Sequence, residues 1–193
     1  MEPDVKIIKY GNKLKDEDIS EYHGGEIIRL VLDAVEEMGT LKGKKAYRDL
    51  LDFIYRCTLW KGKIKPRTLL NSVDDFCYSI SKAKRQEIKN KIQSLIDDEV
   101  PIGRFGAGRF ITAEYENDSK KIIKMLVKIK DQNDNEYEKI YDIAEKYLNE
   151  RISGVKAGII SQILWTMFPN VFPVLNSEGR KHFSNLGIQL EKP

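Results

Sequence analysis

The sequence is poor in the residues that mark several protein classes, with two cysteines, two histidines and six prolines among 193 residues. These cysteines and histidines are scattered and form no zinc-binding pattern, so we expect neither a metal site nor a cofactor. No segment approaches the roughly 18 uncharged apolar residues of a membrane span, which excludes a transmembrane helix. Residues 1–6 lack the apolar core of a signal peptide. These absences predict a cytoplasmic protein with Cys57 and Cys77 as reduced thiols in its core.

Apolar and charged residues are both plentiful. Hydrophobic residues make up 41% and charged residues 33% of the chain, which provides for a core and a well-solvated surface. Because large apolar residues recur throughout, the composition does not indicate disorder. The length predicts a single domain over residues 1–193, or alternatively two helical lobes, 19–98 and 118–188, joined by a glycine-rich loop at 100–111.

The apolar residues recur at helical spacing, and no alternating run is long enough to anchor a sheet. We therefore predict an all-α domain of about eight helices, with at most one short strand at 110–115. Gly39 is expected to end the first helix, Pro66 to begin the third and Ser119 to cap the fifth. The predicted helices cover about residues 19–38, 44–59, 66–80, 88–96, 120–127, 137–148, 159–164 and 178–186.

The net charge of +3 hides an uneven distribution of charge. Residues 1–43 carry a net −4, residues 44–91 carry +8, and residues 92–193 carry −1. The near-neutral total therefore contains a basic middle section.

The sharpest local signal is Ile152–Leu164, in which a helix end, a glycine-containing turn and an apolar helix follow one another. Such a turn exposes main-chain N–H groups at a helix N-terminus, where the partial positive charge favours an anion. Lys156 adds a formal positive charge, so the turn suits a DNA phosphate but reads no base sequence. The alternative is a plain helix–helix turn in which glycine permits close packing. The candidate contacts are Ser153, Gly154, Val155, Lys156 and Gly158.

This segment resembles the helix-hairpin-helix element of the DNA-glycosylase (HhH-GPD) superfamily, in which a glycine–valine turn opens the second helix. The resemblance continues through Phe168–Asn176 and Arg180–Gly187, and it covers about residues 140–188, a quarter of the chain. It implies a C-terminal helix-hairpin-helix element that binds the phosphate backbone of DNA.

Two positions depart from the catalytic pattern of that superfamily. Asn176 stands where the family has an aspartate, and an amide cannot ionise to stabilise an oxocarbenium ion. Gly158 stands near the position of the lysine nucleophile of bifunctional members, and it has no amine for a Schiff base. Lys156 also replaces the second glycine of the hairpin. We interpret the element as a glycosylase-like scaffold without glycosylase chemistry.

The same non-catalytic arrangement resembles the N-terminal recognition domains of McrB-like restriction ATPases and GTPases. In that family a variable domain recognises DNA and an AAA+ motor follows, which implies an AAA+ motor or a nuclease subunit as a partner. The chain has no Gly-x-x-x-x-Gly-Lys-Ser/Thr motif, so it would be only the recognition domain or a stand-alone relative.

Other segments place cations near aromatic residues. The loop after Trp60 would attract phosphates, and its tryptophan could stack on a base; the alternative is a solvated loop with Trp60 in the core. The glycine-rich segment 103–110 pairs two arginines with Phe105 and Phe110; the alternative is an interlobe loop with both rings buried. A third basic run, Lys82–Lys91, is interpreted as the solvated face of a helix. The candidate contacts are Lys61, Lys63, Lys65 and Arg67 in the first segment, and Arg104 and Arg109 in the second.

No set of residues in the sequence points to catalysis. His23 and His182 lie far apart without a nearby nucleophile, and adjacent acids such as Asp74 and Asp75 point in different directions on a helix. The favoured hypothesis is a non-catalytic DNA-recognition module, such as the specificity module of a modification-dependent restriction or defence system. The alternatives are a divergent glycosylase-like base-excision enzyme and a helical protein–protein interaction adaptor.

Overall fold

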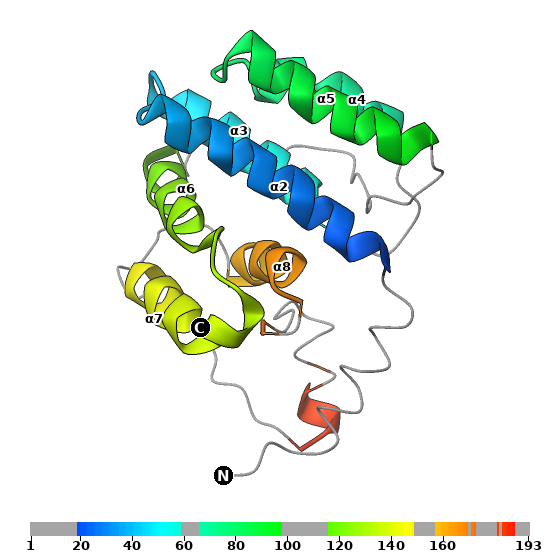
Figure 1. The fold of residues 1–193 in the computed structure, drawn as a ribbon. Helices are drawn as coiled ribbons and strands as arrows, with labels where there is room; N and C mark the ends of the chain where they lie inside the picture. Colours follow the sequence, from blue (N-terminus) through cyan, green and yellow to red (C-terminus); the bar gives the residue numbers. More distant parts are fainter. Residues whose placement is uncertain are drawn as a thin grey trace.

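The computed structural model describes residues 19–58, 66–97, 116–148, 157–169, 171–172, 181 and 183–187. Within these ranges the chain forms α-helices, one 3-10 helix and connecting turns, without a strand (Figure 1). The elements are α2 (Ile19–Met38), α3 (Lys44–Arg56), α4 (Pro66–Phe76), α5 (Lys82–Asp97), α6 (Glu116–Ile129), η2 (Asp134–Glu136), α7 (Tyr137–Leu148) and α8 (Ala157–Met167). The prediction of an all-α fold is confirmed. The strand predicted at 110–115 lies outside the described residues.

Helix α3 lies at the centre of the fold. It packs against α6, α4 and α8, and every residue from Ala46 to Arg56 is buried. In Figure 1, α4 and α5 lie on one side of α2 and α3, and α6, α7 and α8 lie on the other. The two segments predicted as alternative lobes contribute to one hydrophobic core, since α3 packs more extensively against α6 than against any other described helix.

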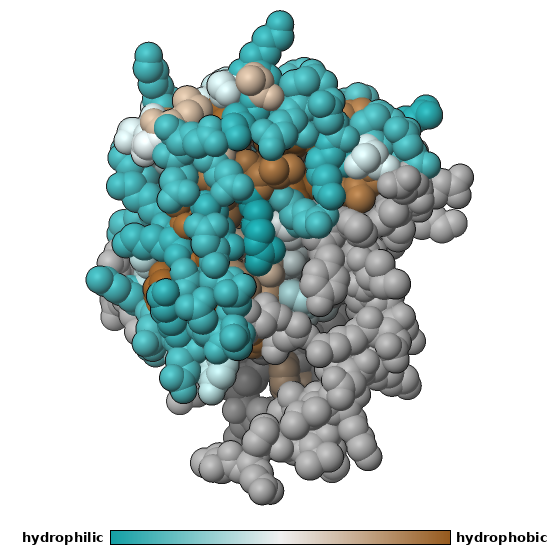
Figure 2. Space-filling view, viewed as in Figure 1, coloured by the Kyte–Doolittle hydropathy of each residue, from teal (hydrophilic) through white to brown (hydrophobic). Residues whose placement is uncertain are grey.

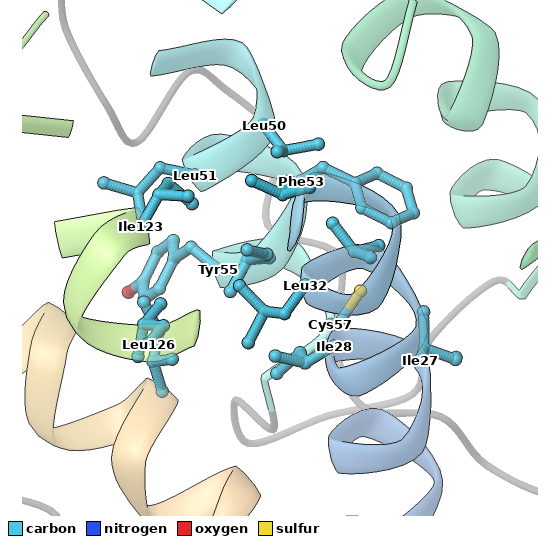
Figure 3. Close-up of a cluster of buried hydrophobic side chains, with 14 of the residues drawn as sticks. Ile27, Ile28, Leu32, Leu50, Leu51, Phe53, Tyr55, Cys57, Ile123 and Leu126 are labelled. Atoms are coloured by element: carbon cyan, nitrogen blue, oxygen red, sulfur yellow. The ribbon is translucent and has the colours of Figure 1, made fainter. Parts of the chain in front are cut away.

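The buried side chains of α3 point in several directions (Figure 3). Leu51 and Tyr55 lie beside Ile123 and Leu126 of α6, whereas the ring of Phe53 lies on the opposite side of α3. All five side chains are at least 93% shielded from solvent, because Tyr55 is 7% exposed and the other four are fully buried.

None of the helices in the described ranges is long and apolar enough to cross a lipid bilayer.

Several predicted helix boundaries are confirmed. Gly39 follows α2 with a φ of 67°, in the left-handed region that favours glycine, and its N–H donates to the carbonyl oxygen of Val35 at 3.0 Å. Pro66 begins α4.

Helix α5 begins at Lys82, earlier than the predicted 88, and Ser81 caps it by accepting a hydrogen bond from the main-chain N–H of Lys84 at 3.3 Å.

Other predicted boundaries are wrong. Ser119 does not cap α6: the helix begins three residues earlier, at Glu116, and Ser119 is buried within it. The acidic residues ahead of Ser119 stabilise the positive end of a helix, which favours the earlier start. Helix α4 ends at Phe76 and not at Ile80, because the chain turns there and the N–H of Ile80 donates to the carbonyl oxygen of Cys77. Helix α3 ends at Arg56, three residues before the predicted end.

Two glycines let the start of α2 approach its neighbours closely. A Cβ atom on Gly24 would lie 2.3 Å from the carbonyl oxygen of Cys57, and one on Gly25 would lie 2.7 Å from that of Thr166. Both distances are far below van der Waals contact, and the atoms met are main-chain atoms that cannot swing aside. The pair therefore sets the distance between α2 and the ends of α3 and α8.

We expect Gly24→Ala to lower the free energy of unfolding by about 1–3 kcal/mol, because the added methyl group forces the main chain of Cys57 away. The usual gain in helix propensity from glycine to alanine, about 1 kcal/mol, acts in the opposite direction and is outweighed. Urea denaturation followed by circular dichroism measures the change. A variant as stable as the wild type would show that the approach at Cys57 is not a tight contact.

Candidate nucleic-acid interface

Most of the residues predicted to bind DNA lie outside the described part of the chain. Two are described: Gly158 lies in the first turn of α8, and Arg67 is exposed in the first turn of α4. Helix α4 packs against α5 and α3, whereas α8 packs against α2 and α3, so these two residues belong to different parts of the fold. The residues outside the description are Ser153, Gly154, Val155, Lys156, Lys61, Lys63, Lys65, Arg104 and Arg109, together with Trp60, Phe105, Phe110 and Asn176.

Helix α8 begins earlier than predicted. It starts at Ala157, two residues before the predicted start at Ile159, so that Gly158 lies within the helix; its first turn has no acidic residue. Beyond this turn, Ile160, Ile163 and Leu164 are buried, which anchors the helix in the core. The turn itself lies outside the described residues, so the hairpin stays a prediction.

Four of the five cations of α5 pair with acids of neighbouring helices. Lys84, Lys89 and Lys91 are each only partly exposed and reach carboxylates of α2 or α4. These contacts favour the interpretation of this run as a solvated, ion-paired helix face. The pairs are Lys84–Glu37 at 2.8 Å, Arg85–Asp74 at 3.6 Å, Lys89–Asp74 at 2.5 Å and Lys91–Glu26 at 2.8 Å.

Helix α6 carries its lysines differently. Lys120, Lys124 and Lys128 are exposed, and none has a carboxylate within ion-pair distance among the described residues. The ammonium of Lys120 lies 5.7 Å from the ring centroid of Tyr47, and that of Lys128 lies 5.3 Å from the ring centroid of Tyr147. In Figure 2 the side of the molecule over α6 and α7 is predominantly hydrophilic. These lysines thus form a cationic row that no described acid neutralises.

Sequence analysis missed this row although the sequence carries a signal for it. The three lysines recur every fourth residue, and no acidic residue lies between Asp118 and Asp131. Residues four apart share one face of a helix. Counting net charge over long sections concealed the row, because acids elsewhere between residues 92 and 193 offset it.

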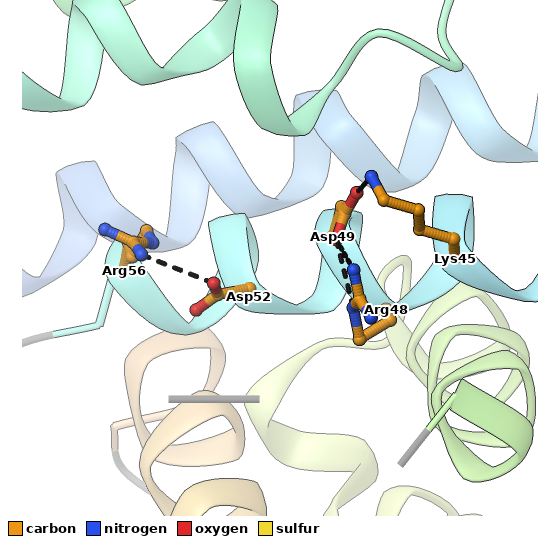
Figure 4. A network of polar contacts seen from close by, with 5 residues as sticks. All are labelled: Lys45, Arg48, Asp49, Asp52 and Arg56. Carbon is orange, nitrogen blue, oxygen red and sulfur yellow. Dashed lines mark hydrogen bonds and ion pairs between the residues drawn. The ribbon is translucent and has the colours of Figure 1, made fainter. Parts of the chain in front are cut away.

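Helix α3 carries a second set of charges (Figure 4), and all of them except the exposed Lys45 are buried. Arg48 donates from Nε and Nη2 to one carboxylate oxygen of Asp49, at 3.1 and 2.8 Å, and Lys45 donates to the other. Further along the helix, Arg56 Nη2 donates to Asp52 Oδ2 at 3.3 Å. Opposite charges on the same helix therefore compensate each other, which allows α3 to be enclosed on all sides.

The carboxylate of Asp49 has a lowered pKa. Burial alone would raise its pKa, but hydrogen bonds from Lys45 and Arg48 outweigh burial and hold the pKa below its ordinary value. A carboxylate with a lower pKa in the folded state than in the unfolded state stabilises the fold at neutral pH. That contribution is lost as the pH falls below about 4, the pKa of the carboxylate in the unfolded state, and then through its lower pKa in the folded state.

Asp49→Asn is expected to lower the free energy of unfolding by about 1–3 kcal/mol at pH 7, because the charge-assisted hydrogen bonds are lost. The difference between variant and wild type should shrink as the pH is lowered from 7 to 3. Urea denaturation at each pH measures it. Asp75→Asn is the control, since Asp75 is exposed and has no ion pair among the described residues. If the difference in the free energy of unfolding between Asp49→Asn and the wild type stayed constant with pH, the lowered pKa of Asp49 would be wrong.

The two cysteines are free and fully buried, as predicted for core thiols. Burial raises the pKa of Cys57, so its thiol stays protonated and unreactive at neutral pH. Among the described residues, no group of histidine, cysteine and acidic side chains is arranged to hold a metal ion.

No protein-family model matches the sequence, and neither a curated protein nor a solved structure matches the chain.

Proposed function

We propose that this chain is a non-catalytic DNA-binding domain that contacts the phosphate backbone through the predicted turn before α8. The observation that supports it best is the start of α8 at Ala157, with Gly158 in a first turn free of acidic residues. The positive end of a helix and its unpaired N–H groups favour a phosphate, and Lys156 lies next to this end in the sequence.

The proposed role is recognition without chemistry. Gly158 provides no amine, and Asn176 provides no ionisable group, at the positions where the resemblance to glycosylases would require them. As a recognition domain of a restriction or defence system, the chain would act with an AAA+ motor or a nuclease subunit that supplies the chemistry. Release of a base from an oligonucleotide panel by the purified chain would overturn this part of the proposal.

Binding of the full chain to a fluorescein-labelled duplex of about 20 base pairs tests the proposal. Fluorescence anisotropy gives the affinity at salt concentrations from about 50 to 200 mM. The logarithm of the affinity should fall linearly with the logarithm of the salt concentration, because phosphate contacts release counterions. Lys156→Glu should weaken binding about tenfold or more. Lys82→Glu, an exposed position on α5 without an ion pair among the described residues, controls for net charge. Undetectable binding at 50 mM salt, or an affinity independent of salt, would contradict the proposal.

A protein-interaction role is the second candidate, and exposed tyrosines favour it. Tyr137 and Tyr141, four residues apart on α7, are 55% and 57% exposed. Aromatic residues are enriched in protein interfaces. Light scattering tests this candidate by measuring the mass of the protein in solution. A mass above that of one chain, which Tyr141→Ala lowers, would favour it if the chain also fails to bind DNA.

A further inference from the structure

The two lysine-rich helices of the fold differ in what surrounds their charges. Lys84, Lys89 and Lys91 of α5 reach acids of α2 and α4, which offsets their charge at the surface. Lys120, Lys124 and Lys128 of α6 have no acidic partner among the described residues. Helix α6 therefore carries a row of three exposed lysines without an ion pair to any described residue, whereas three of the four lysines of α5 are paired, although each helix has four lysines.

The row on α6 is extended by the start of α3. The contact between Lys120 and the ring of Tyr47 places the beginning of α6 beside the first turn of α3. Lys44 lies three residues before Tyr47 and is exposed, so it shares that face of α3. Helix α3 has no side-chain N-cap and no acidic residue in its first turn, which leaves its positive end uncompensated.

The dimensions of the row suit a nucleic-acid backbone. With a rise of about 1.5 Å per residue, Lys120 and Lys128 stand about 12 Å apart along α6. One DNA strand advances about 3.4 Å per phosphate along the duplex axis, so the row spans three to four phosphates. The tyrosine rings beneath Lys120 and Lys128 restrict these two side chains, which reduces the conformational entropy that binding would cost.

We propose that the α6 face, defined by Lys44, Lys120, Lys124 and Lys128, binds the phosphate backbone of duplex DNA. The inference rests on the proposed function, and it adds a contact surface built from described residues to the predicted turn before α8. Lysines act as point charges on phosphates and do not read bases. The face therefore supplies affinity and salt dependence, and sequence selection resides elsewhere in the chain.

Two triple variants with equal changes in net charge test the α6 face. The first is Lys120→Gln, Lys124→Gln and Lys128→Gln on α6, and the matched control is Lys84→Gln, Lys89→Gln and Lys91→Gln on α5. Each contacted phosphate contributes about 0.9 to the slope of log affinity against log salt, so the α6 variant should lower this slope by up to about 2.7. Its affinity at about 0.1 M salt should fall on the order of 10–100-fold. The α5 variant should change affinity less than about threefold.

The measurement uses the full chain and two 20-base-pair duplexes of unrelated sequence. Equal losses on both duplexes are expected, because the lysines contact phosphates alone. A loss confined to one duplex, equal losses from the α6 and α5 variants, or an unchanged salt slope would each overturn the α6 face. Thermal unfolding is recorded in parallel, and a loss of affinity counts only for variants that melt within about 3 °C of the wild type.

Failure of this inference is distinguishable from failure of the proposed function. If the wild-type chain binds duplex DNA and the α6 variant binds it equally well, the α6 face is wrong and DNA binding by other segments stands. If the wild-type chain binds neither duplex at about 50 mM salt, both are wrong.

Discussion

Phe53→Ala should lower the free energy of unfolding by about 3–5 kcal/mol, which is enough to unfold a large share of molecules in a marginally stable domain. Phe53 is fully buried and is among the largest side chains with no exposed surface. It belongs to α3, which α4, α6 and α8 surround, so no exposed segment can move in to fill the space. The loss combines the transfer of a phenyl ring to water with a cavity that cannot collapse.

Two further variants test this explanation. Phe53→Leu fills most of the space and should cost about 1–1.5 kcal/mol. Tyr141→Ala removes an aromatic ring from an exposed helix position and should cost less than about 0.5 kcal/mol. Urea denaturation gives the three values. If Phe53→Ala cost no more than Tyr141→Ala, α3 would not be the centre of the folded core.

The helices could be predicted because their signals are local. Gly39 and Pro66 act through their own backbone preferences, and the apolar spacing of α2, α3 and α7 is visible within each segment. The error at Ser119 has the same origin, because a serine near a helix start matches a cap whether or not the helix begins earlier. The acidic residues ahead of Ser119 favour the earlier start, and Ser119 is buried inside α6.

Contacts between distant segments could not be predicted in this way. Gly24 and Gly25 interrupt an otherwise regular helix pattern, and nothing near them in the sequence shows that Cys57 and Thr166 will lie against them. Most charged residues of α3 are likewise buried, because Asp49 and Asp52 have cationic partners on the same helix. Pairing of this kind depends on what surrounds the helix and not on its periodicity.

The candidate interface divides along the same line. Sequence motifs single out Arg67 as a cation of a basic loop and Gly158 as a residue of a glycine-containing turn. Both lie in the first turn of a helix. The difference between α5 and α6 depends on acids brought in by other helices. Lys89 is neutralised by Asp74, which is 15 residues away, whereas Lys124 has no such neighbour among the described residues. Local charge counts cannot separate these two cases.

Arg29→Met is expected to lower the free energy of unfolding by about 2–4 kcal/mol, because one side chain joins the ends of two helices to α2. Arg29 Nε donates to the carbonyl oxygen of Lys130 at 3.1 Å, and Nη2 donates to that of Met167 at 3.0 Å. These carbonyls lie at the C-terminal ends of α6 and α8, where a positive charge is favourable. The guanidinium also lies 5.2 Å from the ring centroid of Phe168.

Arg29→Lys separates geometry from charge. A lysine keeps the positive charge near both helix ends, but its single ammonium cannot donate in the two fixed directions of a guanidinium. We expect it to recover less than half of the stability lost in Arg29→Met. Full recovery would mean that charge alone stabilises these ends and that the two hydrogen bonds contribute nothing.

Hydrogen exchange locates the effect of the Arg29 variants. If Arg29 joins α6 and α8 to α2, amides in the last turns of α6 and α8, whose carbonyls accept from Arg29, should lose more protection than those of α4. The buried ammonium of Lys130 still pairs with Asp33 at 2.7 Å and with Glu36 at 3.1 Å, so the end of α6 keeps a second link to α2. The end of α8 has no equivalent ion pair among the described residues, and it should therefore lose more protection than the end of α6.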